Sequence, residues 1–259
     1  MGCFLFDKII FWPVVSRRLG ISLGVNLLPR NKKICTFDCI YCECGWTKPD
    51  NYFLSAPYER KEVKVELETA LNVISNNKTG LDTITFAGNG EPTLHPYFAE
   101  IVEDTISLRD KYFPEVKISV LTNGTNLHKT AIAEALKKID NPIIKLDAGT
   151  DSTFRLINRP MIDITHSEIV KNIIGAGIKN TIIQSLFLKG DYKGIAVDNT
   201  NETDLNLWLD LLKQIKPKSV MIYSIARETP AHGLIKLSKE ELESIALKVR
   251  ALGIKAEAY

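Results

Sequence analysis

The sequence of 259 residues has no apolar run long enough to cross a membrane. Its longest run, Ile9–Val15, has seven residues and includes Pro13, whereas a spanning helix needs about 20 apolar residues. No basic stretch precedes an apolar one at the N-terminus, as it would in a signal peptide. Phe6 stands where a myristoylation motif requires Ser or Thr. We therefore expect a cytoplasmic protein without a membrane segment.

The sequence also lacks a bias toward one sign of charge. Its 33 Lys and Arg residues and 31 Asp and Glu residues give a formal net charge of +2. This balance excludes a uniformly basic nucleic-acid-binding protein. A local basic segment ahead of the cysteines consists of Arg17, Arg18, Arg30, Lys32 and Lys33. Such a segment is either a solvated surface or an entrance that binds the phosphates of a nucleotide or tRNA.

No Pro/Ser-rich linker or change in composition divides the chain. The sequence is 45% hydrophobic and 25% charged, which are ordinary values for a globular protein and exclude disorder. Its length fits one large α/β domain or two small ones. We predict a single domain over residues 1–259, with an N-terminal appendage at 1–12 and a core at about 13–252.

Short apolar runs alternate with longer amphipathic segments along the chain. A nearly continuous apolar run is typical of a strand buried on both faces of a parallel sheet. Six such strands are predicted, at Ile21–Leu28, Thr83–Ala87, Lys117–Leu121, Pro142–Leu146, Thr181–Phe187 and Ser219–Ile225. Capping boxes at Thr165/Glu168 and Ser238/Glu241 mark two helix starts. This βα repeat predicts an α/β fold, either a barrel or an open doubly wound sheet.

Polar and glycine-containing segments follow several of the predicted strands. They include Gly88–Pro92, Thr122–Gly124, Asp147–Gly149 and the pair Ala226 and Arg227. The carboxyl ends of parallel strands lie at one end of a barrel or sheet, where active sites form. The sequence therefore predicts one site at that end.

Cysteine is scarce but clustered. Cys35, Cys39 and Cys42 have a C-x3-C-x2-C spacing, Cys44 follows two residues later, and the fifth cysteine is Cys3. Three thiolates on one loop can each bind one iron of a [4Fe-4S] cluster and leave the fourth iron open. Zinc with Cys44 as fourth ligand is the competing interpretation, although no second pair of cysteines follows in the chain. We expect Cys44 to be a free thiol and Cys3 a buried apolar residue.

The cysteine spacing, with Tyr41 directly before the third cysteine, resembles the signature of the radical S-adenosylmethionine (SAM) enzymes. Residues 88–92 resemble their glycine-rich GGE motif, with Asn89 in place of the second glycine. Segments 13–24, 146–149, 157–160 and 226–230 resemble the small Fe-S oxidoreductases related to the wyosine-base synthases of tRNA. The resemblance covers about residues 12–250. Those synthases are expected to carry a second cluster on upstream cysteines, and here only Cys3 lies upstream.

The resemblance implies a partial (β/α)6 barrel with a mostly parallel sheet and a [4Fe-4S] cluster on Cys35, Cys39 and Cys42. It also implies that SAM binds the open iron. One electron from the reduced cluster then cleaves SAM to methionine and a 5′-deoxyadenosyl radical, which takes a hydrogen atom from the substrate. Because the chain has no flavodoxin-like domain, an external flavodoxin or ferredoxin is the expected reductant.

Eight residues are expected to contact or order SAM. They are Tyr41, Gly88, Gly90, Glu91, Asn123, Asp147, Gln184 and Arg227. The two glycines carry no Cβ and would let the backbone approach the methionine amino group, with Glu91 ordering that pocket. The alternative for this segment is an ordinary turn between a strand and a helix, and His95 close by is expected to be a helix-entry residue.

The remaining predicted contacts each have a structural alternative. Tyr41 is expected near the adenine or as a packed aromatic side chain. Asn123 and Asp147 are expected to contact ribose, a carboxylate or the substrate, or else to form turns. Gln184 interrupts an apolar strand and is expected to face the barrel interior. Arg227 suits a carboxylate or phosphate partner, or is a solvated loop charge.

Three functions follow from these alternatives. The first is a radical enzyme that acts on a tRNA base or a related nucleotide. The second is a radical enzyme that acts on a small molecule or peptide. The third is a non-catalytic zinc or iron-sulfur protein, which would not need the polar segments at the strand ends.

Overall fold

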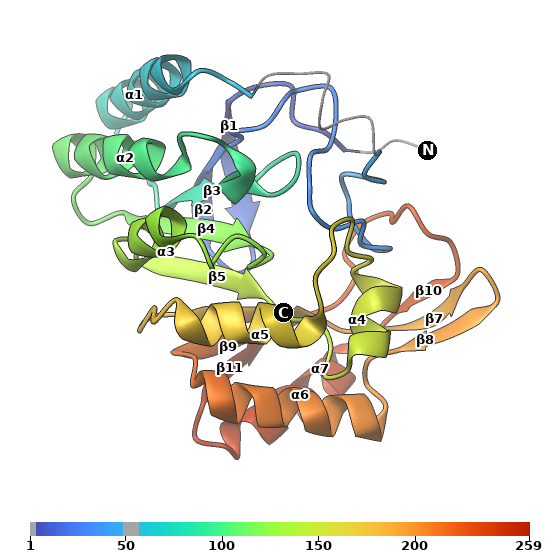
Figure 1. Cartoon of the computed structure of the whole chain (residues 1–259). Coiled ribbons are helices and arrows are strands. Elements are labelled where there is room, and N and C mark those ends of the chain that lie inside the picture. The colour runs from blue at the N-terminus through green and yellow to red at the C-terminus, as the bar shows by residue number, and fades with distance from the viewer. Residues whose placement is uncertain (1–3, 49–56) are drawn as a thin grey trace.

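The computed structural model describes residues 4–48 and 57–259, so the expectation for Cys3 lies outside the described residues. Its centre is a curved sheet in the order β1-β2-β3-β4-β5-β6-β9-β11 (Figure 1). The strands are β1 (Ile10–Ser16), β2 (Gly20–Val25), β3 (Thr83–Phe86), β4 (Lys117–Thr122), β5 (Asn141–Lys145), β6 (Ile182–Leu186), β9 (Ser219–Tyr223) and β11 (Lys255–Ala258).

All six predicted strands are present, as β2, β3, β4, β5, β6 and β9, and neighbours in this series pair in parallel. This confirms the mostly parallel α/β fold. β11 adds a parallel strand at one edge, and β1 adds an antiparallel strand at the other. In the described part of the chain these two edges do not pair, so the sheet is a partial barrel. β1 begins at Ile10, within the segment predicted to be an appendage.

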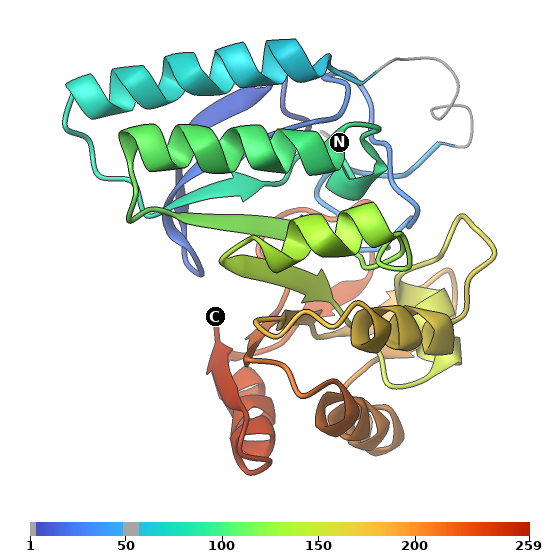
Figure 2. The same ribbon diagram turned by 60° about the vertical axis from the view of Figure 1, so that its left-hand side comes forward.

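Helices line the outer side of the curved sheet (Figures 1 and 2). The helices are α1 (Arg60–Asn76), α2 (Phe98–Tyr112), α3 (Thr130–Lys137), α4 (Asp151–Ile157), α5 (His166–Gly175), α6 (Glu202–Ile215) and α7 (Lys239–Arg250). The capping boxes predicted at Thr165 and Ser238 are present at the starts of α5 and α7. No helix in the described ranges is long and apolar enough to cross a membrane.

The outward-facing strand residues form the main core together with the helices. Ile84 and Phe86 of β3 and Ile118 and Val120 of β4 are fully buried against them. Burying one such side chain stabilises a fold by about 1.5–3 kcal/mol relative to exposure. The alternation of side chains along a strand sends the intervening residues to the barrel interior.

The interior face is more polar than the apolar runs in the sequence predict. Hydroxyl groups of Thr83 and Ser119 bond each other across β3 and β4 at 2.8 Å. A small apolar cluster fills part of the interior and consists of Leu19, Leu121, Ile143, Ile182, Met221 and Tyr259. Leu19 comes from the β1–β2 turn and Tyr259 follows β11, so both edges of the sheet contribute to this cluster.

A second, three-stranded sheet was not predicted. It has the order β10-β7-β8 and consists of β7 (Leu188–Tyr192), β8 (Ile195–Asp198) and β10 (Leu234–Lys236). All its pairings are antiparallel. β7 follows β6 directly and β10 follows β9, so this sheet lies beyond the carboxyl ends of two barrel strands, at the right in Figure 1.

Helix α6 fixes the segment that follows β5. Trp208 is fully buried, and its Nε1 donates to the carbonyl oxygen of Leu146 at 3.1 Å. The Asp204 carboxylate accepts hydrogen bonds from the backbone N–H groups of Gly149 and Thr150, each at 3.0 Å. A Cβ on Gly149 would lie 2.1 Å from the Asp204 carbonyl oxygen, so only glycine allows this approach.

Replacing Trp208 should therefore destabilise the fold and loosen the segment around Asp147. We expect Trp208→Ala to lower the free energy of unfolding by about 3–5 kcal/mol in chemical denaturation, because it leaves a large cavity. Its neighbour Leu207 is 44% exposed, and Leu207→Ala should change that free energy by no more than about 0.5 kcal/mol. Equal effects of the two substitutions would contradict the packing described for α6.

Candidate functional site

The cysteine loop follows β2 and is hydrogen-bonded to the segment after β3. Ile34 N donates to the Asn89 carbonyl oxygen and Glu91 N donates to the Ile34 carbonyl oxygen, both at 2.9 Å. Ile34 and Gly90 form a parallel bridge. The structure thus brings the predicted cysteine motif and the predicted glycine motif together, as neighbouring turns at the carboxyl ends of β2 and β3.

Hydrogen-bond donors from three parts of the chain point at the thiols of this loop. Asn123 Nδ2 lies 3.6 Å and Phe37 N 3.4 Å from Cys35 Sγ. Asn158 Nδ2 lies 3.5 Å from Cys39 Sγ. Donors of this kind stabilise thiolates, the form in which cysteine binds a metal. Burial raises the pKa of Cys35 and Cys39, and the bonds from Phe37 and Asn158 oppose that rise.

Lys33 is a buried cation beside the same thiols. Its side chain is 3% exposed, and its Nζ donates to the Gly45 carbonyl oxygen at 2.9 Å. Burial alone would lower the pKa of Lys33, but the charges of Cys42, Cys35 and Cys39 raise it above its ordinary value. A permanent positive charge at this position offsets part of the negative charge that three thiolates bring into the interior.

The fourth thiol of the cluster differs from the third. A hydrogen bond from Cys44 lowers the pKa of Cys42 to about 5, against the opposing effect of burial and with help from the Lys33 charge. The same hydrogen bond and burial raise the pKa of Cys44. Cys44 Sγ also lies 3.4 Å from the Gly88 carbonyl oxygen, which it can donate to. This arrangement favours Cys44 as a protonated neighbour of a ligand.

The two glycines after β3 make room for the chain itself. A Cβ on Gly90 would lie 1.7 Å from the Ile34 carbonyl oxygen, and one on Gly88 would lie 2.5 Å from Asn26 Oδ1. Both glycines have positive φ angles, 137° and 136°, which L side chains rarely adopt. Their lack of a Cβ therefore serves the packing of two loops, and the approach to a ligand that the sequence suggested stays a prediction.

Asn89, which replaces the second glycine of the usual motif, has a structural role. It is fully buried, and its Nδ2 donates to the Pro29 carbonyl oxygen at 2.9 Å. It also exchanges two hydrogen bonds of 2.8 Å with the backbone of Phe6. The side chain thus attaches the N-terminal segment to the glycine loop.

Glu91 joins the glycine loop to the end of β4. Its Oε1 accepts hydrogen bonds from the hydroxyl groups of Thr93 and Thr122, at 2.6 and 2.7 Å, and its Oε2 accepts one from Asn123 N at 2.7 Å. Burial raises the pKa of Glu91, and these hydrogen bonds oppose that rise. Asn123 in turn donates from Nδ2 to Thr36 Oγ1 at 2.7 Å, which returns the connection to the cysteine loop.

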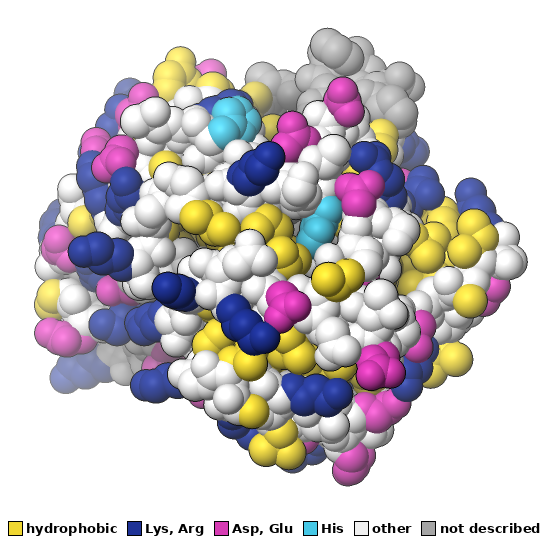
Figure 3. Space-filling model, turned by 60° about the horizontal axis from the view of Figure 1, so that its bottom comes forward, with side chains coloured by type: hydrophobic (Ala, Val, Ile, Leu, Met, Phe, Trp, Pro, Cys, Tyr) yellow, Lys and Arg dark blue, Asp and Glu magenta, His cyan; other side chains and the backbone are white. Residues whose placement is uncertain are grey.

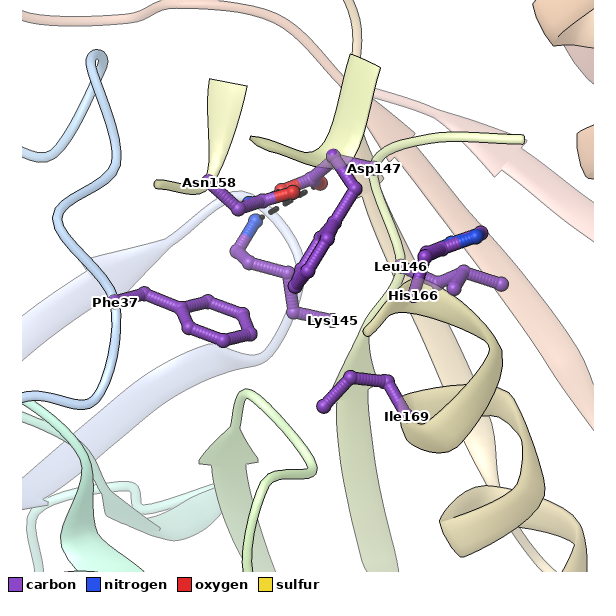
Figure 4. A pocket seen from close by; sticks show the side chains of 8 residues that line it. Phe37, Lys145, Leu146, Asp147, Asn158, His166 and Ile169 are labelled. Carbon is purple, nitrogen blue, oxygen red and sulfur yellow. Dashed lines mark hydrogen bonds and ion pairs between the residues drawn. The ribbon is translucent and has the colours of Figure 1, made fainter. Parts of the chain in front are cut away.

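Asp147, at the end of β5, is the centre of a second network (Figure 4). Its carboxylate accepts hydrogen bonds from Tyr41 Oη, from Asn158 Nδ2 at 2.7 Å and from Leu186 N at 2.8 Å. Lys145 Nζ forms an ion pair with it at 3.2 Å. Tyr41 and Asp147, predicted separately as ligand contacts, thus bond each other across the cysteine loop and β5. Burial and the Asp147 charge raise the pKa of Tyr41, so the phenol stays protonated.

A cavity of about 10 Å³ lies beside this network and is lined by His166, Phe154 and Ile169 as well as by Asp147. Its volume suits one water-sized molecule, so it is too small for a nucleoside (Figure 4). His166 Nε2 is buried there with no hydrogen-bond partner in the described part of the chain.

The last two predicted contacts have different surroundings. Gln184 is 5% exposed and lies on the same face of β6 as Ile182, a member of the interior cluster. Arg227 is largely exposed, and its Nη1 donates to Glu43 Oε2 at 2.6 Å. Glu43 lies between Cys42 and Cys44, so Arg227 flanks the cysteine loop from the far side of the sheet.

His95 bonds the Tyr58 carbonyl oxygen through Nε2 at 2.7 Å and lies at the entry to α2, as expected.

Three residues of the site were missed in the list of predicted contacts: Lys33, Lys145 and Asn158. Lys145 carries a sequence signal, because it is a lysine inside a predicted buried strand, whereas the sequence groups Lys33 with the basic segment before the cysteines. Asn158 carries none by itself. Its role depends on α4 bringing it to Cys39, which lies 119 positions earlier in the chain.

The donor set of the site fits an iron-sulfur cluster. Three thiols lie on one loop, with amide and ammonium donors around them, and a [4Fe-4S] cluster takes a thiolate at each of three irons. A single zinc ion would need at least three ligands gathered around one point. Within residues 4–48 and 57–259 no such group of His, Cys, Asp and Glu side chains exists.

Comparison with known proteins agrees with this chemistry. The sequence profile of the radical SAM superfamily matches residues 33–194, more than half of the chain. The matched region begins just before the cysteine motif and ends in the turn between β7 and β8.

Two relatives align with nearly the whole chain. A UPF0026 protein of Helicobacter pylori is 32% identical over 243 residues, 92% of this chain and 73% of that protein. A Brachyspira hyodysenteriae protein named GTPase Obg is 33% identical over 241 residues, 92% of this chain. The chain spans only 33% of the length of that second relative. An S-adenosylmethionine-dependent nucleotide dehydratase of Flammeovirga pacifica is 25% identical over 209 residues, 78% of this chain and 64% of that protein.

Solved structures share the fold at low identity. A radical SAM methyltransferase from Sphaerobacter thermophilus has a TM-score of 0.64 and 16% identity, over 92% of this chain and 65% of that one. The structure of TYW1 with a lysine-pyruvate adduct has a TM-score of 0.58 and 15% identity, over 89% of this chain and 73% of that one. These similarities support the partial barrel.

The contact between the two loops predicts the effect of Gly90→Ala. The new Cβ would collide with the Ile34 carbonyl oxygen, and the cysteine loop must then move. We expect iron content after anaerobic reconstitution to fall several-fold while far-ultraviolet circular dichroism stays unchanged. Gly175→Ala is the control, because a Cβ there meets nothing within 4 Å and alanine favours a helix by up to about 1 kcal/mol. Full iron loading of Gly90→Ala would refute this role of Gly90.

Proposed function

The chain belongs to the radical SAM superfamily, and from that membership we propose that it is an enzyme which cleaves SAM and abstracts a hydrogen atom from a nucleotide-containing substrate. The main observation behind the proposal is the backbone contact between the cysteine loop and the glycine loop at Ile34 and Gly90, which we call the joint. It brings three thiols, a buried cation and the polar residues after β4 and β5 to one end of the partial barrel.

The cofactors of the superfamily are a [4Fe-4S] cluster and SAM, and we assign the cluster to Cys35, Cys39 and Cys42. When bound and reduced, this cluster supplies one electron that cleaves SAM to methionine and a 5′-deoxyadenosyl radical. Asn123 and Asn158 would orient the thiolates of Cys35 and Cys39, toward which their amides already point. Second partners of this kind tune a metal site and keep its ligands in place.

The remaining predicted contacts hold polar groups at the rim of this site. Gly88, Gly90 and Glu91 form the turn that faces the cysteine loop, and the buried Glu91 carboxylate keeps it in register with Asn123. Tyr41 and Asp147 hold each other on the opposite side. We propose that SAM lies between these two walls, where its polar groups can bond the loop backbone and its adenosine can lie beside Tyr41.

The nucleotide assignment is supported by two observations. Relatives with 25% identity include the nucleotide dehydratase and a GTP 3′,8-cyclase of Streptomyces coelicolor. The basic segment with Arg30 and Lys32 precedes the cysteine loop directly. On the face shown in Figure 3, Lys and Arg side chains alternate with Asp and Glu, so that face offers no continuous basic surface. A small molecule or peptide is the second candidate, which the balanced net charge favours.

The cluster assignment predicts distinct effects of the cysteines. Anaerobically reconstituted protein should contain about four irons per chain and release 5′-deoxyadenosine from SAM when reduced by dithionite or by flavodoxin or ferredoxin. Cys39→Ala should abolish both properties, because one iron loses its ligand. Cys44→Ala, the matched control, should retain most of the iron. A content of one zinc per chain without SAM cleavage would refute the cluster assignment. Turnover with NADPH alone would refute the prediction of an external flavodoxin or ferredoxin.

The nucleotide assignment predicts salt-sensitive RNA binding if the nucleotide is part of tRNA. Binding of tRNA measured by filter retention should weaken steeply from about 50 to about 200 mM salt, because counterions are released from the phosphates. Arg30→Gln should weaken it further. Lys248→Gln, which removes an exposed charge on α7, should not. If no tRNA binds at low salt, the substrate is a free nucleotide or belongs to the second candidate class.

A further inference from the structure

The barrel interior contains a polar cluster of which only Gln184 is among the predicted SAM contacts. Its members are Arg18, Lys145, Gln184 and Tyr223. Arg18 lies in the β1–β2 turn and the other three on β5, β6 and β9. On their own strands, Lys145, Gln184 and Tyr223 each lie two residues beyond a member of the interior apolar cluster, toward the carboxyl end.

Arg18 is a cation that forms no ion pair with an acidic side chain among the described residues. Its guanidinium carbon lies 4.4 Å from the ring centroid of Tyr223. Its Nη1 is buried and has no hydrogen-bond partner in the part of the chain that the structure describes. Glu257, on β11 at the opposite edge of the sheet, accepts a hydrogen bond from Tyr259 at 2.6 Å. An unpaired donor at a buried position costs about 1–3 kcal/mol, so it is retained only where something else bonds it.

Within the described chain, Gln184 is a second residue with an unused, buried hydrogen-bond donor. It is 5% exposed, and its Nε2 is buried without a partner among the described residues. Gln184 pairs directly with Lys145 across β5 and β6, and β9 with Tyr223 is its neighbour on the other side. Arg18 thus contacts the same Tyr223 ring as Lys145, and Gln184 is the register neighbour of Lys145.

Lys145 is the second cation of this cluster. Its Nζ donates to Tyr223 Oη at 2.8 Å and pairs with Asp147 at 3.2 Å. Burial alone would lower the pKa of Lys145, but Asp147 and Tyr223 raise it above its ordinary value, so the side chain is an ammonium. Asp147 already accepts three other hydrogen bonds. Because Lys145 is paired with Asp147, the guanidinium of Arg18 is the charge of this cluster that an anion would balance.

We propose that Arg18, Lys145 and Gln184 form a subsite inside the partial barrel that binds an oxyanion group of the substrate, a carboxylate or a phosphate. The inference rests on the proposed function, since it names the part of the substrate that enters the barrel. A guanidinium, an ammonium and an amide N–H are all donors, and none of them can accept. A group without an acceptor oxygen would leave these donors unpaired, and an anionic oxygen accepts the stronger, charge-assisted hydrogen bonds.

The test uses inorganic phosphate and acetate as probes for the two chemistries. The melting temperature of anaerobically reconstituted protein is measured against probe concentration, at saturating SAM and constant chloride and ionic strength. A ligand of the folded state raises the melting temperature in a saturable manner. We expect such a rise with one of the two probes. The probe that raises the melting temperature shows whether the subsite binds a phosphate or a carboxylate.

Two variants and one matched control make this test specific. Arg18→Gln should raise the apparent dissociation constant of the probe about tenfold or more, because a charged hydrogen bond is lost. Gln184→Leu should weaken probe binding to a similar extent without lowering the melting temperature of the probe-free protein. A merely structural glutamine would show the opposite pattern. Arg17→Gln removes an exposed charge from the same turn and should bind the probe as the unchanged protein does.

Each outcome bears on the proposal separately from the radical chemistry. No saturable rise with either probe, or an equal rise in all variants, would overturn the subsite. Competition between SAM and the probe would assign the pocket to the SAM carboxylate and overturn the substrate role. Iron content and 5′-deoxyadenosine release are measured on the same samples. Probe binding without SAM cleavage therefore contradicts only the proposed function, and cleavage without probe binding contradicts only the subsite.

Discussion

The backbone contact between Ile34 and Gly90 is the constraint on which the rest of the site depends. Ile34 exchanges hydrogen bonds with both neighbours of Gly90, and this approach requires that position 90 carry no side chain. The cysteine loop is otherwise a long excursion from the end of β2. The contact fixes it to β3, and Glu91 extends the attachment to β4. The segments that follow β2, β3 and β4 thus position the thiols relative to the sheet.

The electrostatics of the site follow from this packing. Thiols enclosed by protein are hard to ionise, and burial does raise the pKa of Cys35 and Cys39. The fold offsets this cost with the buried ammonium of Lys33 and with amide donors from α4 and from the end of β4. These compensating groups are spread over more than 120 residues of sequence. They converge only because consecutive parallel strands end on one side of the sheet.

The sequence predicted well whatever depends on local pattern. The six parallel strands, both capping boxes and the neighbouring cysteine and glycine motifs follow from spacing and apolar periodicity. The partners of individual polar residues did not, because they depend on the register between strands. Asp147 and Tyr41 lie 106 positions apart, and nothing in either segment indicates that they bond each other. The sheet β10-β7-β8 was missed because its strands are short and partly polar, and β1 because Pro13 interrupts its apolar run.

The cysteine loop and the sheet β10-β7-β8 are attached to different strands of the partial barrel. Strands β2, β3 and β4 carry the joint with the cysteine loop, whereas β6 and β9 continue into the sheet β10-β7-β8. Substitutions in and beyond β6 and β9 can therefore reshape the mouth of the barrel without disturbing the joint. In evolution, such a fold can change the substrate that it binds while it keeps the loops that hold the cluster.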